Sequence, residues 1–352
     1  MNRWAKSLGI GAAALGGLAL AVTVERIALR AFLKATPVGD IPDAPHATNV
    51  LRLHSDDGCE IHVEVDTPVD MTPATPTVVL THGFGMAAQS WWPQRRALRK
   101  LARVVVWDQR GHGRSGYANA AAEAIVIDRL AMDLAMIIDE VTTGDVVCIG
   151  HSMGGMTIMA LTELRPDLFA DRIKGVVLLA TSAGSIGDVT LGLPGPIAKI
   201  AHQVPSALRM ALAGHDRRHD FFSRIRRNDT DLGLALVRRF AFGETVPEGG
   251  PELVARLLNE TASVAVTDLL VDVYQHDRRG VLAPLRQVPT LIVVGTADLL
   301  TPVEHSREIA GDLPDAQLVE LAGVGHMLGL EQAVRVNELL TGFVLEVSDR
   351  RE

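Results

Sequence analysis

Residues 146–155 read Val146-Val147-Cys148-Ile149-Gly150-His151-Ser152-Met153-Gly154-Gly155. The first four residues form an apolar run with the length of a buried strand, and the segment from Met156 to Arg165, which Pro166 ends, favours a helix. A G-x-S-x-G sequence between a strand and a helix predicts a nucleophile elbow, a turn so tight that its serine is strained and its neighbours must be glycine. Ser152 is therefore the candidate nucleophile, with the positive end of the following helix directed at it.

The composition limits the classes of protein to which this chain can belong. The 352 residues, 47% of them hydrophobic, suffice for one large α/β domain with an insertion or for two smaller domains. The formal net charge of -8 and the isoelectric point near 5.8 argue against a nucleic-acid partner, which would require clustered positive charge. Cys59 and Cys148 are expected to be buried thiols rather than a disulfide, and no spacing of Cys and His suggests a metal site.

Strand and helix signals alternate on both sides of this turn. Two short strands around Asp56-Asp57-Gly58 predict a hairpin, and continuous apolar runs predict buried strands. The expected strands are residues 50–55, 60–65, 77–81, 103–107, 172–180, 290–294 and 317–321, and the expected helices in this part are residues 94–101 and 124–141. Such alternation is typical of a parallel sheet covered by helices.

The N-terminus has the pattern of a membrane or targeting helix over residues 1–35, followed by a Pro-rich linker over residues 36–47. Leu8 to Val24 is seventeen residues without a charge, at the lower edge of what spans a bilayer. We expect an uncleaved anchor or a helix on the membrane surface, and hence a membrane-associated protein. The alternative is a secreted protein cleaved after Ala19-Leu20-Ala21.

An acid and a base follow the last two predicted strands. Asp298 stands in Gly295-Thr296-Ala297-Asp298, and His326 follows Ala322-Gly323-Val324-Gly325. Catalysis needs an imidazole that accepts the serine proton on one nitrogen and a carboxylate that fixes the other nitrogen. Taken singly, Asp298 could be a helix cap and His326 a solvated loop residue. Asp188 is the alternative acid, and His112, between glycines in a charged turn, is the less favoured base.

These motifs, in this order, resemble the α/β-hydrolase family. The matching residues are His82-Gly83-Phe84-Gly85, Asp108-Gln109-Arg110-Gly111-His112-Gly113-Arg114-Ser115, Gly150-His151-Ser152-Met153-Gly154-Gly155, Gly295-Thr296-Ala297-Asp298 and Gly325-His326. The resemblance covers residues 48–184 and 285–348. It implies a mostly parallel eight-stranded sheet with helices on both faces, a triad of Ser152, Asp298 and His326, and an oxyanion hole formed by the amides of Phe84 and Met153.

Residues 185–284 lie where the family inserts a helical lid. Amphipathic segments at residues 196–213, 232–242 and 251–273 favour helices, with apolar side chains that pack on the sheet or line an acyl pocket. This region also holds a group of arginines: Arg217, Arg218, Arg224, Arg226, Arg227, Arg238 and Arg239. The simplest interpretation is a solvated face paired with nearby aspartates, and the alternative is a surface that contacts anionic lipid headgroups.

The expected function is that of a serine hydrolase without cofactor or metal, acting on a small-molecule ester or lipid, such as a lipophilic ester or an acylglycerol, through an acyl-enzyme. A cofactor-free haloperoxidase, a C–C bond hydrolase or an acyltransferase would use the same triad, and a non-catalytic binding protein is the further alternative. Epoxide hydrolases and haloalkane dehalogenases use Asp where this chain has Ser152. The sequence carries no prediction of oligomeric state.

Overall fold

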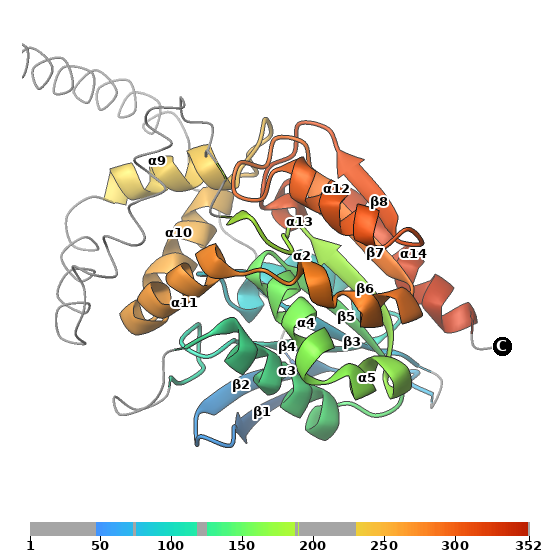
Figure 1. Ribbon diagram of the computed structural model, residues 1–352. Coiled ribbons are helices and arrows are strands. Elements are labelled where there is room, and N and C mark those ends of the chain that lie inside the picture. Colours follow the sequence, from blue (N-terminus) through green and yellow to red (C-terminus); the bar gives the residue numbers. More distant parts are fainter. Residues whose placement is uncertain (1–46, 73–74, 118–124, 187–188, 190–229, 351–352) are drawn as a thin grey trace, which may run out of the picture.

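The computed structural model describes residues 47–72, 75–117, 125–186, 189 and 230–350. Eight strands form one sheet in the order β1-β2-β4-β3-β5-β6-β7-β8 (Figure 1). They are β1 (Asn49–His54), β2 (Glu60–Asp66), β3 (Thr77–Thr81), β4 (Arg103–Trp107), β5 (Val146–His151), β6 (Ile173–Leu179), β7 (Thr290–Gly295) and β8 (Gln317–Leu321). The strands from β4 to β8 are parallel, and β2 is antiparallel to both of its neighbours. The predicted α/β-hydrolase fold, with its N-terminal hairpin, is confirmed.

Helices cover both faces of this sheet because successive strand side chains point to opposite faces. In β3, Val78 and Leu80 pack with α2 (Trp92–Leu98) and α14 (Ala333–Asp349), whereas Val79 packs with the helices of the other face. Those helices are α3 (Ile127–Val141), α4 (Met153–Leu164), α5 (Pro166–Asp171) and α12 (Val303–Asp312). The sheet is thus buried on both sides, as its continuous apolar runs predict.

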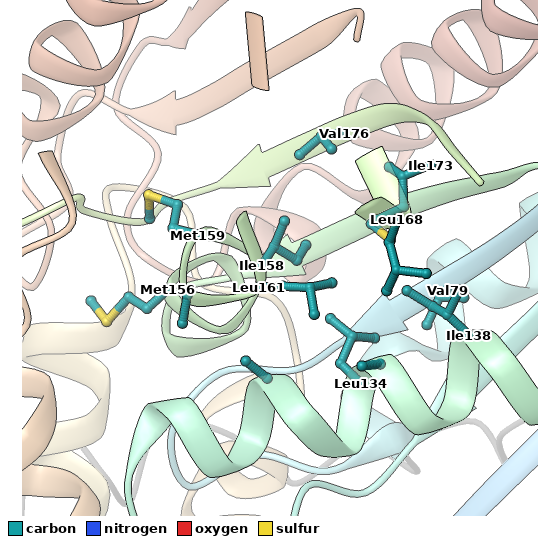
Figure 2. Packing of buried hydrophobic residues seen from close by; sticks show 14 of the residues in the cluster. Val79, Leu134, Ile138, Met156, Ile158, Met159, Leu161, Leu168, Ile173 and Val176 are labelled. Carbon is teal, nitrogen blue, oxygen red and sulfur yellow. The ribbon is translucent and has the colours of Figure 1, made fainter. Parts of the chain in front are cut away.

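The helix α4, which follows the candidate nucleophile, is the most deeply buried of these helices. Figure 2 shows its Met156, Ile158 and Leu161 in a cluster with Leu134 and Ile138 of α3. All three α4 side chains are at most 1% exposed to solvent. Burial of this size fixes the helix relative to the sheet, and so fixes the turn at its N-terminus.

Two helix boundaries differ from the expectation. α4 begins at Met153 rather than at Met156, because the two glycines of the turn lie inside its first turn instead of before it. α2 begins at Trp92 and ends at Leu98, and a 3-10 turn, η1 (Ala88–Trp91), precedes it. Pro93 sits near the start of α2, where a missing N–H costs nothing.

The insertion between β6 and β7 is helical where the structure describes it. It contains α9 (Thr230–Ala241), α10 (Gly250–Glu260), α11 (Ser263–Gln275) and two 3-10 turns, η3 (Arg279–Val281) and η4 (Ala283–Gln287). The expected helix at residues 196–213 lies outside the described residues. The segment predicted as one helix over residues 251–273 is two helices: the Thr261 hydroxyl bonds the Leu257 carbonyl oxygen at 3.0 Å, and the Ala262 amide donates at 2.8 Å to the carbonyl oxygen of Gly111.

The predicted membrane or targeting helix and the linker, residues 1–35 and 36–47, fall almost entirely outside the described residues. Within the ranges that the structure describes, no helix combines the length and the hydropathy needed to cross a bilayer.

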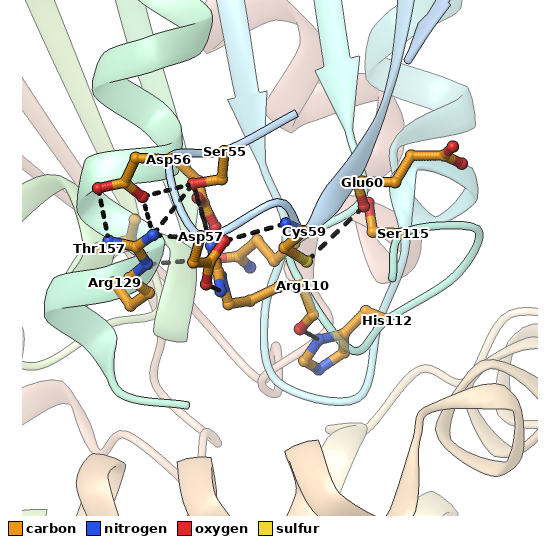
Figure 3. Close-up of polar contacts among 12 residues, drawn as sticks. Ser55, Asp56, Asp57, Cys59, Glu60, Arg110, His112, Ser115, Arg129 and Thr157 are labelled. Atoms are coloured by element: carbon orange, nitrogen blue, oxygen red, sulfur yellow. Dashed lines mark hydrogen bonds and ion pairs between the residues drawn. The ribbon is translucent and has the colours of Figure 1, made fainter. Parts of the chain in front are cut away.

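A buried arginine ties the N-terminal hairpin to the rest of the domain. Figure 3 shows Arg110, from the loop after β4, between the hairpin turn and α3. Its guanidinium lies 2.7 Å from Asp57 in that turn and 2.7 Å from Asp133 of α3. Because the Arg110 side chain is only 1% exposed, its charge needs both carboxylates. This network fixes the loop that also carries His112.

Candidate active site

The turn after β5 holds Ser152 in a backbone conformation that residues with side chains rarely adopt, with φ 51° and ψ -119°. Its amide donates to the carbonyl oxygen of Leu179 in β6 at 2.9 Å. A Cβ atom at Gly150 would lie 2.5 Å from the carbonyl oxygen of Gly154, and one at Gly154 would lie 2.1 Å from that of Thr81. Close backbone contact therefore requires both glycines, so the chain makes the tight turn that the sequence predicts between β5 and α4.

Asp298 and His326 come from the loops after β7 and β8 and meet at the carboxyl edge of the sheet. Nδ1 of His326 lies 2.8 Å from Oδ2 of Asp298. The amides of Leu300 and Thr301 donate to the other carboxylate oxygen at 2.8 and 3.0 Å, and the Thr301 hydroxyl donates to Oδ2 at 2.8 Å. Asp298 and His326 are 4% and 5% exposed. The carboxylate is thus held with one oxygen facing the imidazole, as a catalytic triad would require.

The loop after β3 packs directly against the candidate nucleophile. A Cβ atom at Gly83 would lie 3.1 Å from Cβ of Ser152 and 2.9 Å from Nδ1 of His151. The amide of Phe84 has no hydrogen-bond acceptor among the described residues. Met153 is the first residue of α4, a position whose N–H has no partner within a helix. Two backbone amides next to Ser152 therefore have no hydrogen-bond partner among the described residues.

His112, the less favoured candidate base, lies against the loop after β3 and holds it in place. Its Nε2 accepts the amide of Gly85 at 3.1 Å, and its Nδ1 lies 3.1 Å from the carbonyl oxygen of Arg110. Burial, helped by the neighbouring His82, lowers the pKa of His112 to about 3, so the ring is neutral. A fully buried ring with both nitrogens occupied, away from the cavity described below, holds the loop in place and has no free nitrogen for proton transfer.

His151, the residue before the nucleophile, has a position that its sequence context does not indicate. Its Nε2 lies 2.9 Å from the carbonyl oxygen of His326, and the two ring centres are 4.9 Å apart. Burial, and then the neighbouring His326, lower the pKa of His151 to about 3. Since a carbonyl oxygen only accepts, the neutral ring carries its hydrogen on Nε2. His151 thereby holds the backbone of His326 in place.

One cavity of about 410 Å³ joins these elements to the inserted helices. Ser152, His326 and Phe84 line it from the side of the sheet. Most of its other lining is apolar: Met86, Met156, Ile186, Val189, Leu236, Val237, Phe240, Ala241, Val254, Leu258, Leu270, Val273, Leu300 and Met327. Among the described residues that line it, none is Asp, Glu, Lys or Arg. The cavity can therefore receive an uncharged, apolar group next to Ser152.

Asp188, the alternative acid, lies outside the described residues. In the described ranges, no group of three or more His, Cys, Asp and Glu side chains is placed to hold a metal ion.

Comparison with known proteins agrees with this architecture. The sequence model of a family described as alpha/beta hydrolase fold matches residues 76–333, more than half of the chain. A curated relative, the dihydrolipoyllysine-residue acetyltransferase component of the acetoin cleaving system of Pseudomonas putida, is 28% identical over 269 residues. That match covers 76% of this chain and 63% of the relative, so the chain spans less than two thirds of its length.

Two solved structures have the same fold. A thermophilic esterase from Thermogutta terrifontis superposes with a TM-score of 0.64 at 23% identity, over 86% of this chain and 100% of that one. The enol-lactonase from Burkholderia xenovorans LB400 gives a TM-score of 0.65 at 24% identity, over 84% of this chain and 100% of the other. At these identities the likeness concerns the fold.

Proposed function

The chain belongs to the α/β hydrolase fold family, and from this premise we propose that it is a serine hydrolase that cleaves lipophilic carboxylic esters through an acyl-enzyme. The observation that carries the proposal is the cavity: Ser152, on its strained turn, and His326, whose Nδ1 is 2.8 Å from Asp298, both line it. In this proposal Ser152 is the nucleophile, His326 the general base and acid, and Asp298 the carboxylate that orients the imidazole.

The first half of the reaction forms the acyl-enzyme. His326 takes the proton of the Ser152 hydroxyl on Nε2 while the serine oxygen attacks the carbonyl carbon of the ester. The oxygen of that carbonyl becomes negative and is bound by the amides of Phe84 and Met153, and one such donor contributes about 2.7–4 kcal/mol. His326 then gives the proton to the departing alcohol, and the acyl group remains on Ser152.

The second half of the reaction removes the acyl group. A water molecule gives a proton to His326 and attacks the acyl carbon, and the oxyanion forms in the same place. When the bond to Ser152 breaks, the serine oxygen recovers the proton from His326 and the carboxylic acid leaves. Asp298 stays ionised and stabilises the imidazolium through both halves.

The cavity supports the class of substrate. An engineered cavity of about 150 Å³ binds one benzene molecule, so the 410 Å³ beside Ser152 has room for a considerably larger apolar acyl group. A charged acyl group would lose its hydration there without gaining a counter-ion from the described lining, which costs several kcal/mol. Lipophilic esters, including acylglycerols, fit this environment.

Covalent labelling tests the proposal directly. A fluorophosphonate probe should attach to Ser152 in the purified protein, located by peptide mass spectrometry, and the Ser152→Ala variant should lose both labelling and hydrolysis of p-nitrophenyl esters. Ser348→Ala, in α14, is the matched control and should behave as the parent protein. Ester hydrolysis that persists in Ser152→Ala at the parent rate would exclude the proposed nucleophile.

A further inference from the structure

The loop that carries His326 runs beside the end of α9. The Met327 amide donates to the carbonyl oxygen of Ala241 at 2.9 Å, and the Glu244 amide donates to that of Gly323 at 2.8 Å. These bonds join residues 323–327, on the sheet side, to residues 241–244, on the side of the inserted helices. The histidine loop and the end of α9 therefore form one short paired structure.

Two glycines allow the two segments to touch backbone to backbone. A Cβ atom at Gly243 would lie 2.5 Å from the amide nitrogen of Gly325, and a Cβ atom at Gly325 would lie 2.3 Å from the amide nitrogen of Gly243. Any side chain at either position would push the segments apart. Their two amides, brought this close, need a shared acceptor, because a buried N–H without a partner is costly.

Glu331, the last residue of α13 (Leu328–Glu331), provides that acceptor. Its Oε2 accepts the amide of Gly325 at 2.9 Å and the amide of Gly243 at 2.8 Å. The residue is 9% exposed, and its other oxygen has no hydrogen-bond partner among the described residues. A single carboxylate oxygen thus joins the histidine loop to the end of α9.

The charge environment is consistent with this role. Burial raises the pKa of Glu331, while the amides of Gly325 and Gly243 act to lower it. The titratable groups that act on the carboxyl are Asp298, which raises its pKa further, and His326, which lowers it. The carboxyl is thus electrostatically close to the pair that is proposed to activate Ser152.

The same α9 that Glu331 holds forms a wall of the cavity, through Leu236, Val237, Phe240 and Ala241. We infer that Glu331 is a positioning residue that sets the place of His326 and the place of the α9 wall together, so that binding of the acyl group and the alignment of the base are coupled. This inference rests on the proposed serine-hydrolase function.

Two variants separate the reach of the side chain from its charge. Glu331→Gln keeps an acceptor oxygen at the same distance and removes the charge, whereas Glu331→Asp keeps the charge and shortens the side chain by one carbon. Both keep a polar group in the site, which favours folding of both proteins. Glu338→Gln and Glu338→Asp, at an exposed position of α14, are the matched controls.

The measurements are kcat and KM for p-nitrophenyl acetate and p-nitrophenyl octanoate, with active sites counted by fluorophosphonate titration. Glu331→Asp should lower kcat per active site on the order of 10²-fold, the usual effect of misplacing a catalytic group by about 1 Å. It should raise KM several-fold for octanoate and hardly at all for acetate, since only the long acyl group reaches α9. Glu331→Gln should keep kcat within a few-fold of the parent value.

Three outcomes would overturn the inference: an unchanged kcat in Glu331→Asp, an equal loss in Glu331→Gln, or a loss that active-site titration traces wholly to unfolded protein. Failure of the proposed function would be distinguishable, because then Ser152→Ala would keep its activity whatever the Glu331 variants do.

Discussion

The Nε2 atom of His151 lies 2.9 Å from the main-chain oxygen of His326, so the residue before the proposed nucleophile holds the proposed base in place. The contact joins the turn after β5 to the loop after β8, two segments far apart in the sequence. Its hydrogen comes from His151, because the ring is neutral and the carbonyl oxygen has none to give.

Replacing His151 by Phe should keep the aromatic ring and remove this hydrogen bond. The carbonyl of His326 would then be buried without a donor, which costs about 1–3 kcal/mol of stability. We expect urea denaturation to show a loss of that size and kcat to fall, with KM little changed. The variant His54→Phe, at an exposed position of β1, should show neither effect, and equal effects in the two variants would contradict the positional role.

Replacing Asp298 by Asn should remove the negative charge and put a neutral amide where the carboxylate faces Nδ1 of His326. A change of this kind in a serine protease triad lowers kcat by about 10⁴-fold, and we expect a loss of that order with the fold intact. Esterase assays and circular dichroism would measure both. Asp188→Asn is the matched control, because Asp188 was the alternative acid: a larger loss there than in Asp298→Asn would reverse the assignment.

Replacing Gly83 by Ala should displace the loop that carries Phe84. The new methyl group would meet His151 at 2.9 Å and Ser152 at 3.1 Å. Loss of one oxyanion donor lowers kcat by about 10²–10³-fold, and we expect an effect of this size in single-turnover assays. Gly342→Ala, in α14 with no atom within 4 Å of the added carbon, should leave kcat unchanged and stabilise the helix slightly.

Replacing Leu270 by Trp should fill part of the cavity from α11. Long acyl esters would lose kcat/KM relative to acetate, because the larger side chain occupies the space that their chain needs. A series of p-nitrophenyl esters from acetate to decanoate would reveal a shift of the preference to shorter chains. Leu345→Trp, at an exposed site of α14, is the control, and an unchanged profile in Leu270→Trp would place the acyl group elsewhere.

Stability should depend on pH through Glu64 in β2. Burial acts to raise its pKa, but hydrogen bonds from His62 and Arg95 outweigh burial and lower it to about 2, from an ordinary 4.5. Because the folded pKa is depressed, the stabilisation is complete above the ordinary value and is lost as the pH falls from about 4.5 towards about 2. At neutral pH it amounts to roughly 3 kcal/mol.

Urea unfolding of the parent and of Glu64→Gln between pH 2.5 and 7 would measure this contribution. The gap in unfolding free energy between them should be largest at neutral pH and narrow as the pH falls. A gap that stays constant over this range would show that the Glu64 carboxylate does not gain stability from its partners. Glu60→Gln, at the half-buried start of the same strand, is a control.

The sheet could be predicted from the sequence because its signals are local. The strands β3, β4 and β8 have the predicted bounds, since each is a short run of strand-forming residues between a turn and a polar loop. The motif around Ser152 likewise indicates its own turn, because the need for glycine at Gly150 comes from Gly154 and Gly155 nearby, although the need at Gly154 comes from the backbone of Thr81 in β3. The break between α10 and α11 has no such local signal, since it depends on a hydrogen bond from the Ala262 amide to the carbonyl oxygen of Gly111.

The residues that hold the candidate catalytic groups in place could not be predicted from local sequence patterns. Glu331 stands in a segment without a distinctive pattern, and its partner Gly243 is 88 positions away. His151 is visible in the motif, but only the folded chain places it against His326. Both act through backbone groups, which have the same chemistry at every position and so leave no signal in a single sequence.

The positions around Ser152 and the positions that line the cavity differ in which amino acids they can accept. Neighbouring side chains at Gly83, and backbone at Gly150 and Gly154, leave no room for a side chain, whereas α9, α10 and α11 contribute ordinary apolar side chains to the cavity. In its descendants, or in a library made by directed evolution, new substrate preferences should arise from point changes on those three helices, while the proposed catalytic residues are inherited intact.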